Sequence, residues 1–420
     1  MKKVITNRLF MATFVSDMLS NFGDVLYYLA LMNMVLLVPE TKLAIALVTV
    51  SESFPYLTMV FMGMWGDKTR NKVDRILATQ LFRVVLYMIV TYAMGSKPAL
   101  WIVIVAVLVN VLSDLSGQYE NALYMPLSLR IVSDEDREAM YAFRQGTSSV
   151  LRIIFQSSGA LLVGIMTYQQ LAFFNAGTFL VSAVIMLVLR PSLLRLLKKS
   201  PISFAAPTST ANSPRHFVSD LWKALKEAFI AVDKIPSLKA SILAIAGLNA
   251  IFAAEDALIL LTIREHADFM IVNPAVTLAA FSISSLAGMI SGSILTTRVF
   301  KEVSFKLLLR AAVLMSLLLF VGYLCHAVGF VLLIHFLALT ICGVFNPKMN
   351  ALVVRSLPEN RLATIGAGID RFCTLGMVVS RWTLSVLVTV LSAETISLIF
   401  VLLSLALLGY TISIKKLSIR

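Results

Sequence analysis

The sequence predicts an all-α membrane protein with twelve transmembrane helices, and three observations support this fold class. The chain of 420 residues is 59% hydrophobic and has a mean hydropathy of +0.87, which is more apolar surface than a soluble fold can hide. Apolar runs long enough to cross a hydrocarbon core of about 30 Å recur along the chain. The connections between these runs alternate between strongly and weakly basic, as in a chain that crosses a membrane repeatedly.

Six apolar runs precede a polar stretch and six follow it. The runs lie at about 9–37, 42–65, 76–95, 99–124, 139–167, 170–190, 238–262, 270–296, 305–325, 327–346, 362–391 and 394–414. We therefore predict an N-terminal six-helix half at 1–192, a cytoplasmic linker with an amphipathic helix at 193–236, and a C-terminal six-helix half at 237–420. A weak internal repeat, which relates Gly63-Met64 to Gly288-Met289, favours two halves in parallel orientation.

The linker has two parts of different composition. Residues 201–214 are rich in Ser, Thr, Ala and Pro and lack periodicity, which is typical of a flexible connection. Residues 217–232 alternate apolar and charged side chains. This pattern indicates either an amphipathic helix on the inner membrane surface or a cytoplasmic start of the seventh membrane helix.

The net charge of +13 comes from bases that cluster between apolar runs, so it indicates cytoplasmic loops and no nucleic-acid partner. The basic connections are 68–75, 190–199, 215–239, 298–306, 355–361 and 415–420, and the opposite connections are short and carry few bases. We expect a multi-pass protein of the cytoplasmic membrane with both termini in the cytoplasm.

No pattern of enzyme or cofactor chemistry is present in the sequence. Cys325, Cys342 and Cys373 lie in or beside apolar runs without pairing or ligand spacing, so we expect no disulfide, no metal site and no cofactor. There is no nucleophile–base spacing, no H-E-x-x-H and no phosphate-binding loop. An intramembrane enzyme or a receptor is therefore the least favoured class.

The loop at 63–75 carries the most specific motif. It holds two acids and four bases within residues 67–75, between two apolar runs, so it must turn at a membrane surface. Gly63, Asp67, Lys68, Arg70 and Lys72 resemble the signature G-x-x-x-D-[RK]-x-G-R-[RK] between helices 2 and 3 of the major facilitator superfamily, although the second glycine is missing. The resemblance implies twelve helices, alternating access, a gating loop that ends at Arg75 and a monomer. We expect Glu120 to pair with Arg70 or Arg75. In the family, such pairs latch the outward-facing state.

Polar residues also recur at helical spacing inside several apolar runs. Each ionisable group at a helix centre costs about 2.5–3.5 kcal/mol in hydrocarbon, so residues that share a helix face are expected to point into the bundle. The stripes are Asp17, Asn21, Asp24 and Tyr28; Asn110, Asp114, Gln118 and Asn121; Gln145, Ser149, Arg152, Gln156 and Gly159; Asn249 and Asp256 beside Glu255; and Asp370, Thr374 and Arg381.

These stripes predict a hydrated transport path, and buried ion pairs such as Asp114 with Arg152 are the structural alternative. The substrate-cavity candidates are Asn21, Tyr28, Asn110, Arg152, Gln156, Asn249, Asp370 and Arg381. A carboxylate in a poorly hydrated cavity gains and loses a proton near neutral pH. The proton-coupling candidates are Asp24 first and Glu52 second, then Asp17, Asp114, Glu255 and Asp256. His335 is either a proton relay or a core residue.

Two further resemblances bear on the direction of transport. Gly146, Gly159 and Gly164 partly match the glycine-rich helix 5 motif of antiporters in the family, although simple helix packing explains small residues equally well. The segment 21–31 is similar to the first helix of the macrolide-efflux and siderophore-exporter branch.

We therefore expect proton-coupled efflux of a small amphiphilic molecule, with Na⁺ as the other possible coupling ion. A lipid or lysolipid flippase on the same fold, or an importer of an anionic nutrient, remain the alternatives.

Overall fold

The computed structural model describes residues 2–201, 236–296, 300, 302–356 and 362–413. The chain divides into two compact units, one of residues 1–205 with 272–280 and one of 206–271 with 281–420. The described residues form helices and no strand, which confirms the all-α class. The predicted linker at 193–236 lies mostly outside the described residues, although its first residues continue the helix that ends at Lys199.

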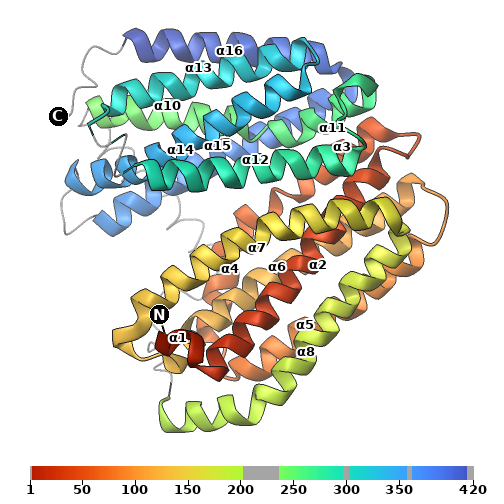
Figure 1. Cartoon of the computed structure of the whole chain (residues 1–420), viewed down its shortest axis with the longest axis vertical. Helices are drawn as coiled ribbons and strands as arrows, with labels where there is room; N and C mark the ends of the chain where they lie inside the picture. Colours follow the sequence, from red (N-terminus) through yellow and green to blue (C-terminus); the bar gives the residue numbers. More distant parts are fainter. Residues whose placement is uncertain (1, 202–235, 297–299, 301, 357–361, 414–420) are drawn as a thin grey trace. The chain divides into compact units, whose positions relative to one another are not determined.

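The helices of the first half follow one another through short connections (Figure 1). They are α1 Lys2–Thr6, α2 Arg8–Val35, α3 Thr41–Ser51, α4 Phe54–Lys68, α5 Lys72–Ala93, α6 Leu100–Ile131, the 3₁₀ turn η1 Asp134–Asp136, α7 Arg137–Ile165 and α8 Tyr168–Lys199.

The second half repeats this organisation. Its elements are α10 Pro236–Phe252, α11 Glu255–Glu265, the 3₁₀ turn η2 Ala267–Phe269, α12 Pro274–Leu295, α13 Phe305–Leu324, α14 Val328–Ser356, α15 Leu362–Val390 and α16 Ala393–Ser413.

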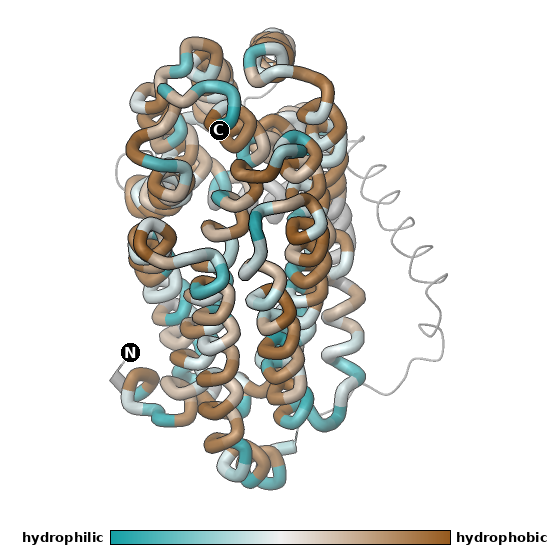
Figure 2. Tube along the Cα trace, turned by 90° about the vertical axis from the view of Figure 1, so that its right-hand side faces the viewer, coloured by the Kyte–Doolittle hydropathy of each residue, from teal (hydrophilic) through white to brown (hydrophobic). Residues whose placement is uncertain are grey.

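In the described residues, a helix or a pair of helices lies at each of the twelve predicted spans. Ten of them are single spans that are long and apolar enough to cross a membrane, including α10 with α11, and the bent stretch Thr41–Lys68 makes an eleventh. The twelfth is α2, whose 28 residues are long enough but whose polar stripe lowers its hydropathy. Figure 2 shows hydrophobic residues along the helices and hydrophilic residues gathered at their connections.

Two of the spans are interrupted near their middle. The first of these spans bends by 46° between its parts 41–59 and 61–68, at a point within α4. Its interruption lies earlier, where Glu52 and Ser53 between α3 and α4 leave the helical pattern. Pro55 explains the interruption because it has no N–H to donate to the preceding turn. Between α10 and α11, Ala253 and Ala254 form a similar break, and acids occupy the first turn of α11, where the helix dipole favours negative charge.

The helices of each unit pack side by side and leave apolar side chains on the outside. In the first unit α8 packs against α2 and α5, and α6 packs against α4 and α5; in the second unit α13 packs against α14 and α16. Exposed apolar residues such as Val85 on α5 and Val188 on α8 suit contact with lipid, where no hydrophobic penalty applies.

Glycines allow two close helix approaches in the second unit. A Cβ at Gly292 on α12 would collide with the carbonyl oxygen of Thr340 on α14, and a Cβ at Gly343 would lie 2.6 Å from the carbonyl oxygen of Met289. The predicted helix 5 glycines differ from one another. A Cβ at Gly159 would lie 2.8 Å from Leu29 on α2, whereas Gly146 and Gly164 have no described atom within 4 Å of an added Cβ.

We expect Gly292→Ala to lower the thermal stability of the detergent-purified protein, because the rigid Thr340 backbone cannot move aside. Overpacking of this kind costs about 1–3 kcal/mol. Gly146→Ala is the matched control and should leave the midpoint of thermal unfolding unchanged or slightly raised, because alanine favours the helix by about 1 kcal/mol. Equal midpoints for the two variants would contradict the tight α12–α14 contact.

Candidate functional site

The first unit contains a polar cavity of about 300 Å³ between α2, the α3–α4 break, α5 and α6. Five of the lining residues are acids and one is a base. The lining residues are Asp17, Ser20, Asn21, Asp24, Glu52, Pro55, Tyr56, Arg83, Asp114, Gly117, Gln118, Glu120 and Asn121. Since each acid comes from a helix or a helix break, the cavity wall is held by the packed helices and not by loops.

A buried ion pair between α2 and α5 forms one side of the cavity. Arg83 donates from Nη2 to both carboxylate oxygens of Asp24, at 3.0 and 2.8 Å, and from Nε to the hydroxyl of Ser113 at 2.8 Å. Its guanidinium carbon lies 3.8 Å from the centroid of the Phe179 ring on α8. The side chain of Arg83 is only 6% exposed, whereas that of Asp24 is 37% exposed because it faces the cavity.

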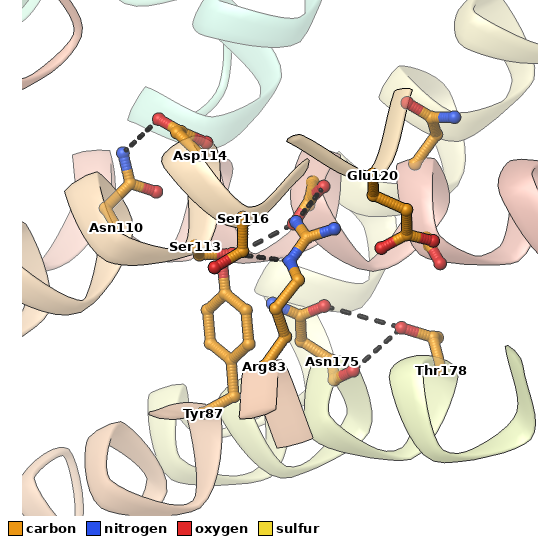
Figure 3. Close-up of polar contacts among 12 residues, drawn as sticks. Arg83, Tyr87, Asn110, Ser113, Asp114, Ser116, Glu120, Asn175 and Thr178 are labelled. Carbon is orange, nitrogen blue, oxygen red and sulfur yellow. Dashed lines mark hydrogen bonds and ion pairs between the residues drawn. The ribbon is translucent and has the colours of Figure 1, made fainter. Parts of the chain in front are cut away.

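Aromatic residues pack against this ion pair. The Tyr87 hydroxyl donates to Ser113 at 3.1 Å, and its ring stacks on Phe179 and meets Tyr27 edge-on. Figure 3 shows Arg83 and Tyr87 reaching from α5 toward Ser113 on α6. Arg83 therefore has little room to take another position.

Sequence reasoning missed Arg83, although a signal was present. Gln80, Arg83 and Tyr87 on α5 follow a helical spacing of three and four residues within an apolar run, and a charge inside such a run is itself a sign of function.

Two acids of the cavity lining converge on a single amide, that of the substrate-cavity candidate Asn110, which is not itself among the lining residues. Asn110 donates from Nδ2 to Glu52 Oε1 at 3.0 Å and to Asp114 Oδ2 at 3.2 Å, and the contact with Asp114 is drawn in Figure 3. Glu52 lies at the α3–α4 break, while Asn110 and Asp114 are one turn apart on α6. The predicted pairing of Asp114 with Arg152 is not formed: Arg152 is exposed and does not line the cavity.

The remaining acids of the cavity have different partners. Glu120 accepts hydrogen bonds from Gln80 at 2.8 Å and from Thr79 at 3.2 Å, so the expected pairing of Glu120 with Arg70 or Arg75 is corrected to polar residues of α5. Asp17 forms an ion pair with Arg144 of α7 at 2.6 Å and accepts a hydrogen bond from Asn21.

The predicted stripe on α2 thus contributes Asp17, Asn21 and Asp24 to one wall, while Tyr28 is not among the lining residues.

The predicted gating loop has one buried member. Lys72 is 2% exposed and donates to the carbonyl oxygen of Gly66 at 2.6 Å, so it closes the turn between α4 and α5. Asp67, Lys68, Arg70 and Arg75 are exposed. The hydroxyls of Thr69 and Tyr119, 2.7 Å apart, join this turn to α6. A Cβ added to Gly63 would meet no described atom within 4 Å.

The candidates of the second half form a separate network in the second unit. Glu255 lies 2.7 Å from Nδ1 of His335 and accepts a hydrogen bond from the Tyr323 hydroxyl at 3.1 Å; Nε2 of His335 lies 2.9 Å from the Ser285 hydroxyl. Arg381 donates to Asp256 at 3.1 Å.

The other candidates contribute less to this picture. Asn249 is half-buried on α10. Gln156, on α7, has a buried carbonyl oxygen without a described partner. The side chain of Asp370 lies outside the described residues.

Asp24→Asn should destabilise the protein by about 3 kcal/mol, because it leaves the guanidinium of Arg83 buried without a counterion. The figure is at the low end for buried pairs, since Asp24 faces the cavity. The double variant Asp24→Asn with Arg83→Gln should recover most of the loss, as measured by thermal unfolding in detergent. The control Asp74→Asn breaks the exposed pair with Arg190 and should change little. A double variant less stable than Asp24→Asn would contradict this account of the pair.

Solved structures of membrane transporters share this fold. The chain is similar to a bacterial homologue of the iron transporter ferroportin in its inward-facing state, with a TM-score of 0.68, 15% identity and coverage of 98% of this chain and 99% of that one. It is also similar to a mutant of the nucleoside transporter NupG (TM-score 0.67, 12% identity, 97% and 100% covered). A third is the peptide transporter POT in complex with sulfate (0.66, 12%, 95% and 93%). At these identities the likeness shows the fold alone.

No curated protein sequence matches the chain. The sequence profile of the Major Facilitator Superfamily, however, matches residues 5–381, which is nearly the whole chain and ends within α15. With twelve spans, two units and the loop signature at 63–75, the chain belongs to the Major Facilitator Superfamily and is a multi-pass membrane transporter of a small molecule.

Proposed function

We propose that this transporter exports a small amphiphilic compound in exchange for protons, and that the compound carries positive charge. The observation that carries the proposal is the cavity wall in the first unit, where five carboxylates face one guanidinium that Asp24 already binds. A carboxylate binds either a proton or a cationic group. When both compete for the same carboxylates, binding of one releases the other, which is the basis of exchange by alternating access.

The coupling group in this proposal is the pair Glu52 and Asp114. Both accept a hydrogen bond from the one amide nitrogen of Asn110, so their charges repel each other when both are ionised. A proton on either acid, or a cationic substrate between them, relieves this repulsion. Glu52 lies at the break between α3 and α4. A change of its charge can therefore alter the backbone at a point where the helix is already interrupted, as at the binding sites of other transporters.

Asp24, the first coupling candidate from the sequence, has a different part in this scheme. Its charge balances the buried Arg83, and a proton on Asp24 would leave that guanidinium without a counterion. We therefore assign Asp24 to the architecture of the site.

The direction of transport and the class of compound rest on the sequence resemblances. The helix 5 glycines and the segment 21–31 favour export of a drug-like, macrolide-like or siderophore-like compound. The acidic lining disfavours an importer of an anionic nutrient, because Arg152 lies outside the cavity lining and Arg381 is bound to Asp256.

Proteoliposomes loaded with a pH-sensitive dye test the proposal. In sodium-free buffer under an imposed pH gradient, we expect cationic amphiphiles to dissipate the gradient with the wild-type protein, and neutral or anionic ones to have little effect. Asp114→Asn should abolish proton movement but keep exchange of labelled substrate, since asparagine still hydrogen-bonds to Asn110 and cannot take up a proton.

Asp74→Asn, the same substitution at an exposed pair outside the cavity, is the matched control and should behave as wild type. Proton movement by Asp114→Asn at the wild-type rate would remove the coupling assignment. A response only to anionic compounds would overturn the cationic substrate. A response that requires sodium would replace the proton by Na⁺ as coupling ion.

One observation favours the second candidate, a lysolipid flippase. The second unit has an apolar hollow of about 380 Å³ between α10, α15 and α16, lined by Gly247, Ala250, Ile251, Ser380, Phe400, Leu403, Ala406, Leu407 and Tyr410. Leu403 and Tyr410 are exposed, so an acyl chain has access to it from the surface of the unit.

Transfer of a fluorescent lysolipid across the bilayer of the same proteoliposomes tests this alternative. If the flippase is correct, Ala406→Trp, which fills the hollow, slows the transfer severalfold, whereas Leu402→Trp, on the outer face of the same helix, does not. We expect no protein-dependent transfer under the export proposal. Transfer that only Ala406→Trp slows, without proton movement by any amphiphile, would establish the flippase in its place.

A further inference from the structure

Two histidines and a glutamate meet at one end of the second unit, apart from the residues considered so far. His266 follows α11, His326 lies in the turn between α13 and α14, and Glu394 is in the first turn of α16. One side-chain ligand atom from each residue lies within 4.8 Å of the other two. All three connections belong to the short, weakly basic set that the charge pattern assigns to the outer side of the membrane.

The distances within this cluster lie on either side of those between ligands of one metal ion. Nε2 of His266 makes a hydrogen bond of 2.5 Å with Oε1 of Glu394, which an ion would have to replace, and Nε2 of His326 lies 3.7 Å from the same oxygen. Neighbouring ligands of a tetrahedral zinc ion are about 3.3 Å apart, given zinc–nitrogen distances near 2.0–2.1 Å. The two imidazole rings stack with centroids 3.6 Å apart and planes at 21°, which brings both rings to the same side of the carboxylate.

One nitrogen of the cluster lacks a hydrogen bond. Nε2 of His326 is buried and has no hydrogen-bond partner among the described residues. A buried polar atom without a partner costs about 1–3 kcal/mol, and it is rare enough to require an explanation. A metal ion held jointly with His266 and Glu394 would satisfy this nitrogen.

The backbone shows that histidine at position 326 is not required by the turn. His326 has a φ of 50°, in the left-handed region. Its N–H bonds to the carbonyl of Tyr323, and the N–H of Ala327 bonds to that of Gly322, which is the Schellman motif that ends α13. Glycine fills this position without strain, whereas another residue costs about 1 kcal/mol or more. Histidine is one of the few other residues enriched in this region, so the turn accepts it here without requiring it.

We propose that His266, His326 and Glu394 bind a divalent transition-metal ion, with Zn²⁺ as the best fit. Two imidazole nitrogens and one carboxylate oxygen suit zinc, while calcium and magnesium prefer ligand sets made of oxygen. The side chains of His266, His326 and Glu394 are 24%, 23% and 42% exposed, so the cluster borders solvent although Nε2 of His326 is itself buried, and water can serve as a fourth ligand.

The bound ion would link the end of α11, the α13–α14 turn and the start of α16, which already lie close together. Next to the cluster, the Glu265 carboxylate accepts a hydrogen bond from the backbone N–H of Ala393 at 2.7 Å, so the end of α11 and the start of α16 are held in position before any ion binds. An ion at the cluster adds the α13–α14 turn to this link. Because the ion binds the folded unit, it stabilises that unit by RT ln(1 + c/Kd), where c is the free ion concentration, so the gain increases with c.

The test uses the full-length protein in detergent, purified with a tag that contains no histidine. Titration with Zn²⁺ should show one ion bound per chain and a higher midpoint of thermal unfolding, and Co²⁺ should give the visible absorption of a low-symmetry nitrogen–oxygen site.

Two variants separate loss of the ion from loss of the fold. His326→Gly should weaken Zn²⁺ binding by at least about 100-fold, because loss of even an outer-shell partner costs about 10–100-fold. Its midpoint without metal should equal or exceed that of wild type, because glycine relieves the backbone strain. Glu394→Gln should also abolish the stabilisation by Zn²⁺. The control His216→Ala removes a histidine of the linker and should bind as wild type.

Two results would overturn the proposal. One is the absence of Zn²⁺ binding by the wild-type protein in its folded state. The other is binding that His326→Gly and Glu394→Gln both retain, which would locate the ion elsewhere.

Discussion

The cavity of the first unit depends on the buried ion pair between Arg83 and Asp24. Removing a guanidinium from water is compensated only when its donors are satisfied, and here Asp24, Ser113 and the face of Phe179 share that task. These partners lie on α2, α6 and α8, so the contacts of the Arg83 side chain hold three helices in position relative to α5. Arg83 is the only base among the lining residues, and its pairing with Asp24 keeps it from binding a ligand. The cavity is therefore acidic.

An acidic cavity inside a membrane protein is stable only with water or a cation to balance it. Asp17 has Arg144 and Asp24 has Arg83, whereas the contacts of Asp114 and Glu120 are with neutral side chains, Asn110 for one and Gln80 and Thr79 for the other. The wall therefore has carboxylates whose state depends on what enters the cavity. The proposed ion coupling rests on this dependence and not on the number of acids.

Helical periodicity was sufficient to predict one side of this site. The spacing of Asp17, Asn21 and Asp24 placed them on one face of α2, and the stripe from Asn110 to Asn121 placed Asp114 on α6, because residues three and four apart on a helix share a face whatever surrounds it. Contacts between helices could not be predicted in this way. The pairing of Asp24 with Arg83 and the partners of Glu120 depend on how α5 packs against its neighbours. The helical period of a single sequence carries no information about that packing.

The same limit explains the histidine cluster. His266, His326 and Glu394 come from three connections far apart in the sequence, and only the packing of α11, α13, α14 and α16 brings them together. Sequence spacing identifies metal ligands when they lie on one helix or hairpin. The expectation of no metal site rested on the absence of such spacing, and this spacing does not reveal ligands that come from three separate connections.

The two halves place acids differently at their interrupted helices. In the first unit Glu52 lies at the α3–α4 break and faces a cavity together with Asp114. In the second unit Glu255 begins α11, and its side chain is 5% exposed between His335 and Tyr323. A carboxylate that borders a cavity can exchange its proton for a ligand, whereas one enclosed by a histidine and a tyrosine holds neighbouring helices together. Both units therefore interrupt a helix beside an acid, while the surroundings of the two acids differ, and the exchange proposed above uses those of the first unit.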